Sequence, residues 1–95
     1  MQLTELDNFK NEILFSANKF GARNIKVFGS VARGEADDDS DIDFLVEMYK
    51  GRALSDRITF KQDLLKILVR DVEMISIKAI KGRIKENILT DAVSL

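Results

Sequence analysis

The stretch that decides the fold is FGSVARGEADDDSDIDFLVE, residues 28–47. A Gly-Ser pair follows one apolar run, and a second apolar run begins immediately after a cluster of acidic residues. The members of this cluster are Glu35, Asp37, Asp38, Asp39, Asp41 and Asp43. Carboxylates this close repel one another, so a chain that places them against the edge of its own core needs a compensating partner.

Size and composition narrow the choice of partner. The chain has 95 residues, a formal net charge of −1, 45% hydrophobic residues and neither Cys nor His. These values predict one globular domain, residues 1–95. Without thiolate or imidazole, any metal must be held by oxygen, which favours Mg²⁺, Mn²⁺ or Ca²⁺. No apolar run approaches the ~20 residues that span a bilayer, and the N-terminus lacks a signal core. We therefore expect a cytoplasmic protein without membrane contact.

Apolar periodicity predicts alternating helices and strands. Helices are expected at residues 3–20, 30–36, 54–69 and 77–88, and strands at 24–28, 41–48 and 72–77. A capping box of Thr4 and Asp7 would begin the first helix, and Gly21 would end it. The stripe expected to be buried on the third helix contains Leu54, Ile58, Leu65 and Leu68. This order predicts an α/β fold in which helices pack against a sheet.

Asp41 and Asp43 lie two apart on the predicted strand 41–48, so their side chains share one face and their Cα atoms are about 6.6 Å apart. Two carboxylates at that spacing repel by roughly 2.5 kcal/mol at an effective dielectric constant of about 20. A divalent cation between them would offset this repulsion and could bind phosphates. For residues 37–39 we favour the simpler interpretation of a solvated acidic loop.

The Gly29-Ser30 pair ends one predicted strand and begins a helical turn. Free backbone N–H groups at such a turn form an anion site, which would place a triphosphate near the metal of the acidic strand. Other phosphate and cation motifs do not fit. A Walker A loop from Gly29 would require Lys-Ser/Thr where Glu35-Ala36 stand. Neither register of an EF-hand loop provides its obligatory Gly and bidentate Glu.

The motifs G-S-V-A-R-G, E-A-D-D-D and S-D-I-D, within residues 29–43, resemble the signature of the DNA-polymerase-β-type nucleotidyltransferases. Within this superfamily, the chain is most similar to the minimal nucleotidyltransferases. The resemblance implies a small mixed sheet with helices packed against it, and transfer of a nucleotide from ATP to a hydroxyl. It further implies that Gly29 and Ser30 bind the phosphates. Asp41 and Asp43 would bind Mg²⁺, or Mn²⁺ in its place.

The resemblance also implies a third carboxylate on a later strand, which would bind the metal and act on the acceptor hydroxyl. In this sequence Glu73 stands where the family usually has Asp, and a displacement of about 1 Å from the added methylene can cost ~10²-fold in rate. Asp71 is the reserve candidate, although a surface acid is its simpler interpretation. Arg33 is predicted either to contact phosphate or a partner, or to form a salt bridge with the neighbouring acids.

Minimal nucleotidyltransferases are often encoded beside a HEPN-domain protein. The resemblance therefore implies an antitoxin that places AMP on a hydroxyl, with tyrosine as the expected acceptor, of a partner HEPN toxin. One alternative is a weakly active or inactive binding module that neutralises its partner by forming a complex. Another is a nucleotidyltransferase that acts on a small-molecule hydroxyl. Nucleic acid is not expected as a partner, because no aromatic stacking platform accompanies the basic residues Lys78, Lys81, Arg83 and Lys85.

Overall fold

The computed structural model describes residues 1–37 and 39–95. Asp38, one of the acids expected in a solvated loop, lies outside the described residues. The helices are α1 (Leu3–Asp7), α2 (Lys10–Phe20), α3 (Gly29–Arg33), α4 (Leu54–Leu68) and α5 (Gly82–Asp91), with a short 3-10 helix, η1 (Ile77–Ala79). The strands are β1 (Ala22–Phe28), β2 (Ile42–Met48), β3 (Val72–Ser76) and β4 (Val93–Ser94).

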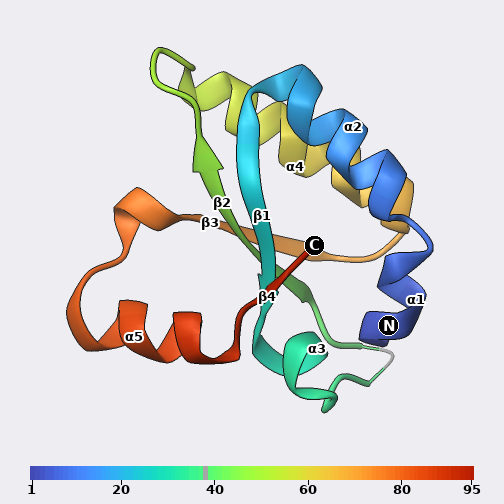
Figure 1. Cartoon of the computed structure of the whole chain (residues 1–95). Coiled ribbons are helices and arrows are strands. Elements are labelled where there is room, and N and C mark those ends of the chain that lie inside the picture. Colours follow the sequence, from blue (N-terminus) through green and yellow to red (C-terminus); the bar gives the residue numbers. More distant parts are fainter. Residues whose placement is uncertain (38) are drawn as a thin grey trace.

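The four strands form one mixed sheet in the order β3-β2-β1-β4 (Figure 1). β2 lies at the centre, antiparallel to β1 and parallel to β3. The parallel pair requires a long crossover, which α4 provides. The predicted mixed sheet with helices packed against it is therefore confirmed.

The core lies between one face of the sheet and helices α2 and α4, which pack against each other (Figure 1). Alternation along β2 sends Ile42, Phe44 and Val46 into this core, where each is at most 1% exposed. The opposite face of β2 carries Asp43 and Leu45. Hydrophobic burial against α2 and α4 thus fixes which face of the sheet carries the central acid.

The first predicted helix is divided in two. Residues 3–20 form α1 and α2, separated at Asn8 and Phe9. The capping box predicted at Thr4 and Asp7 is wrong, because Gln2 is the N-cap and its backbone N–H donates to Glu5 Oε1 at 3.3 Å. Gly21 does end α2 in a left-handed conformation, with φ of 77°. This stop is confirmed.

The prediction of which α4 side chains are buried is partly wrong. Phe60, Leu64 and Leu68 face the core, whereas Leu54 is 62% exposed and Ile58 is 48% exposed. The sequence of α4 carries two apolar stripes, and the one that contains the bulky Phe60 buries more apolar surface when it faces the sheet.

The C-terminal segment also departs from the prediction of one helix at residues 77–88. It forms η1, then α5, and then the unpredicted strand β4, which pairs with β1. No residue of α5 is fully buried, and Ile84 is 65% exposed. No helix in the described part of the chain combines the length and the apolar character that a bilayer-spanning helix needs.

Candidate active site

Asp43 lies at the centre of the sheet, and its register partners surround it on the face away from α2 and α4. In the antiparallel pair its partner is Phe28, the last residue of β1, and in the parallel pair its partner is Glu73 of β3. Directly paired residues project to the same face of a sheet. The fold therefore gathers Asp43, Glu73 and the end of β1 at one place.

The turn at Gly29 meets the carboxyl group of Asp43. Gly29 has φ of +75°, and a Cβ built on it would collide with Asp43 Oδ2 and lie 3.2 Å from Asp43 Cγ. Only glycine combines this left-handed conformation with so close an approach. The Gly29-Ser30 turn and the acidic strand, predicted to act together, are therefore in direct contact, and Ser30 beside it is partly exposed.

The surroundings of Asp43 disfavour the ionised form of its carboxyl group. Burial raises the pKa of Asp43 above its ordinary value, and the negative charges of Asp41 and Glu73 raise that pKa further, while the positive charge of Arg33 acts in the opposite direction. Asp41, which lies just before β2, and Glu73 of β3 thus both act on the charge of Asp43. An acid held in such surroundings is a candidate for metal binding or catalysis.

This environment predicts a pH-dependent stability. Because the folded chain raises the pKa of Asp43, the stability from this group is present below the unfolded-state pKa and is lost as the pH rises through the folded-state pKa. We expect Asp43→Asn, which cannot ionise, to melt higher than the wild type at about pH 7, by on the order of a few degrees. The difference should close below about pH 4, where the carboxyl group is protonated.

Thermal unfolding followed by circular dichroism between about pH 3 and 8 measures this effect. Asp39→Asn is the matched control, because Asp39 is an exposed acid in the preceding loop. Its melting curve should follow that of the wild type. The prediction is wrong if Asp43→Asn melts below the wild type at neutral pH.

Glu73 and Asp71, the two candidates for the third carboxylate, occupy different places. Glu73 is paired with Asp43 and adds to the rise of its pKa. Asp71 precedes β3, is not among the charges that shift the pKa of Asp43, and lines a separate cavity of about 470 Å³ with Asp39 and Ser40. The geometry therefore favours Glu73 over Asp71 as the third carboxylate.

The donor chemistry of the site suits a hard divalent cation. Asp41, Asp43 and Glu73 offer only oxygen, the ligand that Mg²⁺ and Mn²⁺ take, and the repulsion felt by Asp43 would be relieved by a positive charge. Within residues 1–37 and 39–95, no group of three or more acids is already gathered tightly enough to hold a metal ion. Mg²⁺ commonly binds through one or two carboxylates together with substrate phosphates, and the paired acids fit that mode.

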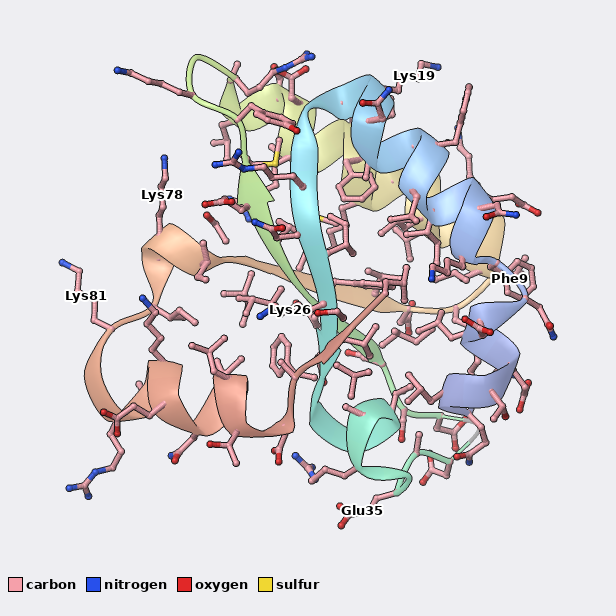
Figure 2. All side chains as sticks on the ribbon, in the orientation of Figure 1. Phe9, Lys19, Lys26, Glu35, Lys78 and Lys81 are labelled. Atoms are coloured by element: carbon pink, nitrogen blue, oxygen red, sulfur yellow. The ribbon has the colours of Figure 1, made fainter. Side chains whose placement is uncertain are left out.

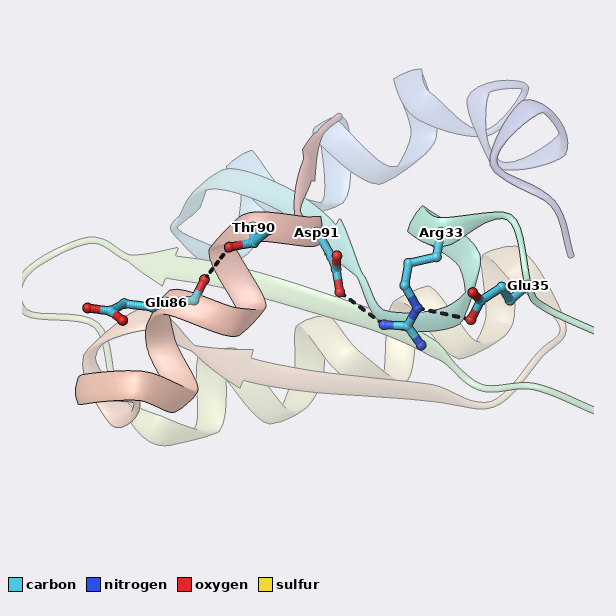
Figure 3. Close-up of polar contacts among 5 residues, drawn as sticks. All are labelled: Arg33, Glu35, Glu86, Thr90 and Asp91. Carbon is cyan, nitrogen blue, oxygen red and sulfur yellow. Dashed lines mark hydrogen bonds and ion pairs between the residues drawn. The ribbon is translucent and has the colours of Figure 1, made fainter.

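Arg33 connects the end of α3 to α5. Its Nε donates to Glu35 at 3.1 Å and its Nη1 donates to Asp91 at 3.0 Å (Figure 3). The predicted salt bridge to a neighbouring acid is therefore confirmed for Glu35. The contact with Asp91, which is 58 positions away, could not be predicted from sequence spacing. Its positive charge still lowers the pKa of Asp43, so the Arg33 guanidinium lies near the site.

The loop before β2 behaves as a solvated acidic turn where the structure describes it. Asp37 Oδ1 accepts hydrogen bonds from the backbone N–H of Asp39 at 2.9 Å and from Ser40 Oγ at 3.0 Å. The hydrogen bond from Ser40 is the largest of the causes that lower the pKa of Asp37. Asp37 and Ser40 therefore shape the entry into β2, and the preference for a surface role of Asp37 and Asp39 is confirmed.

Comparison with known proteins places this geometry in a family. The nucleotidyltransferase domain matches residues 7–95. Over 90 residues the chain is 33% identical to a Methanocaldococcus jannaschii protein named for protein adenylyltransferase activity, and the match covers 95% of this chain and 97% of that one. It is 36% identical over 75 residues to the protein adenylyltransferase MntA of Thermococcus cleftensis, with 79% and 76% of the two chains covered.

Solved structures agree with this assignment. A minimal nucleotidyltransferase structure superposes with a TM-score of 0.89 at 38% identity, covering 100% of this chain and 97% of that one. A tri-AMPylated Shewanella oneidensis HEPN toxin in complex with an MNT antitoxin shares the fold at a TM-score of 0.69 and 19% identity, with 93% and 69% covered. The resemblance inferred from the motifs is therefore confirmed. The chain belongs to the nucleotidyltransferase domain family and is a minimal nucleotidyltransferase.

Proposed function

We propose that this nucleotidyltransferase transfers AMP from ATP to a hydroxyl of a HEPN-domain toxin and thereby acts as its antitoxin. The observation that carries the proposal is the contact of the Gly29 turn with the carboxyl group of Asp43. Phosphates held at the turn would lie against the central acid of the sheet. The names of the relatives support the choice of reaction and partner, since they include protein adenylyltransferases and an antitoxin bound to a HEPN toxin.

Each residue of the site has a role in this proposal. Backbone N–H groups at Gly29 and Ser30 would bind the phosphates. Asp41 and Asp43 would hold Mg²⁺ or Mn²⁺, which when bound supplies positive charge to the phosphates. Glu73 would accept the proton of the acceptor hydroxyl. The acceptor oxygen forms a bond to the α-phosphorus, the bond from that phosphorus to the β-phosphate oxygen breaks, and pyrophosphate leaves.

The nucleotide and the acceptor in the proposal rest on different observations. One structure that shares the fold, at a TM-score of 0.74 and 22% identity, is of a toxin–antitoxin with AMP-PNP. This name supports an adenine nucleotide as the substrate. The choice of a tyrosine hydroxyl as the acceptor rests on the resemblance of the sequence motifs to those of the minimal nucleotidyltransferases. The proposed location is the cytoplasm, where ATP and such a partner would be found.

A second candidate function is neutralisation of the partner by binding alone. It is favoured by Glu73, whose side chain is one methylene longer than that of the Asp usual at this position in the family. One experiment separates the two functions: the protein is incubated with labelled ATP, Mg²⁺ and a candidate HEPN-domain partner protein. Transfer of label, with the added mass of AMP on the HEPN chain, supports the enzyme. A stable complex without transfer supports the binding module.

The same assay identifies the third carboxylate. We expect Glu73→Gln to lower the transfer rate by about 10²-fold, because the acceptor hydroxyl loses its proton acceptor. Asp71→Asn is the matched control, since Asp71 lies two residues away and lines a different cavity. It should change the rate less than about threefold. The reverse result, with Asp71→Asn inactive and Glu73→Gln active, would assign the third carboxylate to Asp71.

A further inference from the structure

A second cavity lies on the same face of the sheet as Asp43. Its volume is about 370 Å³, within the range of about 300–1,000 Å³ typical of small-molecule sites. We call it the β1–η1 pocket, and it is lined by Asn24, Lys26, Leu45, Val46, Glu47, Ile77 and Ser94. β1, β2, η1 and β4 therefore all contribute to it.

Strand register fixes the distance of this pocket from the candidate active site. Leu45 lies two residues beyond Asp43 on β2, so the two share a face and their Cα atoms are about 6.6 Å apart. Lys26 is paired with Leu45, just as Phe28 is paired with Asp43. The pocket thus begins two residues along β2 from Asp43. A nucleotide with its phosphates at Gly29 and Asp43 is long enough to reach this pocket with its sugar and base.

The lining of the pocket combines an apolar floor with a few polar groups. Ile77 of η1 is partly exposed and presents apolar surface to the pocket, whereas Leu45, which also lines it, is 1% exposed. Glu47 is held in place by Arg23 at 2.7 Å and by Asn24 at 2.8 Å. An apolar floor with fixed hydrogen-bonding groups at its edge suits a flat, polar-edged ring such as a nucleobase.

Lys26 supplies a cation to this pocket. Its side chain is partly buried, and it forms no ion pair with any carboxylate in residues 1–37 and 39–95. Figure 2 shows Lys26 over the sheet, whereas Lys78 and Lys81 extend outward from the C-terminal segment. A partly buried ammonium group with three donors and no ion-pair partner is available to a ligand.

We propose that the β1–η1 pocket receives the base and ribose of the nucleotide substrate, with Lys26 donating hydrogen bonds to the nucleoside. This inference rests on the proposed function, because it assumes that the phosphates bind at Gly29 and Asp43. The proposal explains how a chain of 95 residues binds the nucleoside, because the C-terminal elements η1 and β4 complete the pocket.

The test compares the binding of ATP and of inorganic tripolyphosphate, both with Mg²⁺, by isothermal titration calorimetry. Ser94→Phe should fill the pocket and weaken ATP binding by about tenfold or more, while tripolyphosphate binding stays within about twofold. Ser55→Phe is the matched control, since Ser55 is an exposed serine on α4 outside this pocket, and it should leave both ligands unaffected. Lys26→Met, which leaves β4 unaltered, should also weaken ATP binding by about tenfold while sparing tripolyphosphate.

Three results would overturn the inference. Equal losses of affinity for ATP and for tripolyphosphate would show that the substitutions affect phosphate binding rather than nucleoside binding. Unchanged ATP binding combined with slower transfer would assign the pocket to the acceptor. A wild-type chain that binds neither ligand would refute the proposed function itself, and a wild-type chain that binds both with equal affinity would refute only the nucleoside pocket. If Ser94→Phe does not fold, as judged by circular dichroism, the result with Lys26→Met decides.

Discussion

Asp43→Asn is expected to lower the rate of AMP transfer by about 10³-fold or more while the chain stays folded. The reason is that Asp43 is the acid that meets the Gly29-Ser30 turn and also pairs with Glu73. In the proposed function, its replacement would remove a metal ligand from the place where charge develops during transfer. The measurement is the single-turnover rate of label transfer from ATP to the HEPN partner, together with a thermal melt of each variant.

Asp37→Asn is the matched control for this prediction. Asp37 belongs to the same acidic cluster, but it is exposed and its carboxylate only organises the loop before β2. We expect its transfer rate to stay within about threefold of the wild type, because general neutralisation of the cluster is not the cause of the loss. A second readout is the effect of Mg²⁺, which should raise the melting temperature of the wild type and of Asp37→Asn but not of Asp43→Asn. Equal activity of Asp43→Asn and the wild type would exclude Asp43 from catalysis.

Gly29→Ala is expected to produce the second large effect. The added methyl group would collide with Asp43 Oδ2, so either the turn or the carboxyl group must move. A displacement of about 1 Å at the site can lower the rate by ~10²-fold, and the strained backbone with the collision should cost about 2–4 kcal/mol of unfolding free energy. Denaturant unfolding and the transfer assay measure the two effects separately.

Gly34→Ala separates the collision from the backbone strain. Gly34 has the same φ of +75° as Gly29, but a Cβ on Gly34 would have no atom within 4 Å among those the structure describes. We expect Gly34→Ala to cost only about 1 kcal/mol and to retain transfer activity. The double variant Gly29→Ala/Asp43→Ala should lose less unfolding free energy than the two single variants lose together, because the shorter side chain at position 43 relieves the collision. Additive losses of unfolding free energy would show that the alanine at position 29 does not collide with Asp43.

The parts of the fold that could be predicted from the sequence are those determined locally. β2 was predictable because alternation along it places Ile42, Phe44 and Val46 on one face, and all three are buried. The Gly29-Ser30 turn was predictable because a small residue and a hydroxyl after an apolar run mark the end of a strand and the start of a helical turn. Local chemistry also indicated that Asp37 and Asp39 form a surface loop.

The features that could not be predicted depend on contacts distant in the chain. The orientation of α4 is decided by which of its two apolar stripes meets the sheet, and that choice depends on the shape of the core around Phe60. β4 contains only Val93 and Ser94, too few residues to produce a periodic signal. The Arg33–Asp91 contact joins two helices that no spacing rule relates.

Within the candidate site, the sequence supplied the residue types but not the pairing that aligns them. Asp43 and Glu73 could be placed on strands, yet a slip of one residue between parallel strands would send one of the two acids to the other face. Burial of Val72 and Met74 in the core fixes the register that pairs Glu73 with Asp43. The third acid is therefore specified by its apolar neighbours on β3 rather than by the acidic motif itself.

The parallel pairing of β2 with β3 also determines when the site can form. Asp43 and its partner Glu73 are 30 positions apart and meet only after α4 has crossed over and docked. Closing such a loop is slow compared with forming the β1–β2 hairpin, so the acids should assemble late in folding. A newly synthesised chain that has formed only its first two strands would carry the Gly29-Ser30 turn without the completed carboxylate pair. The proposed nucleotide chemistry would thus be restricted to fully folded molecules.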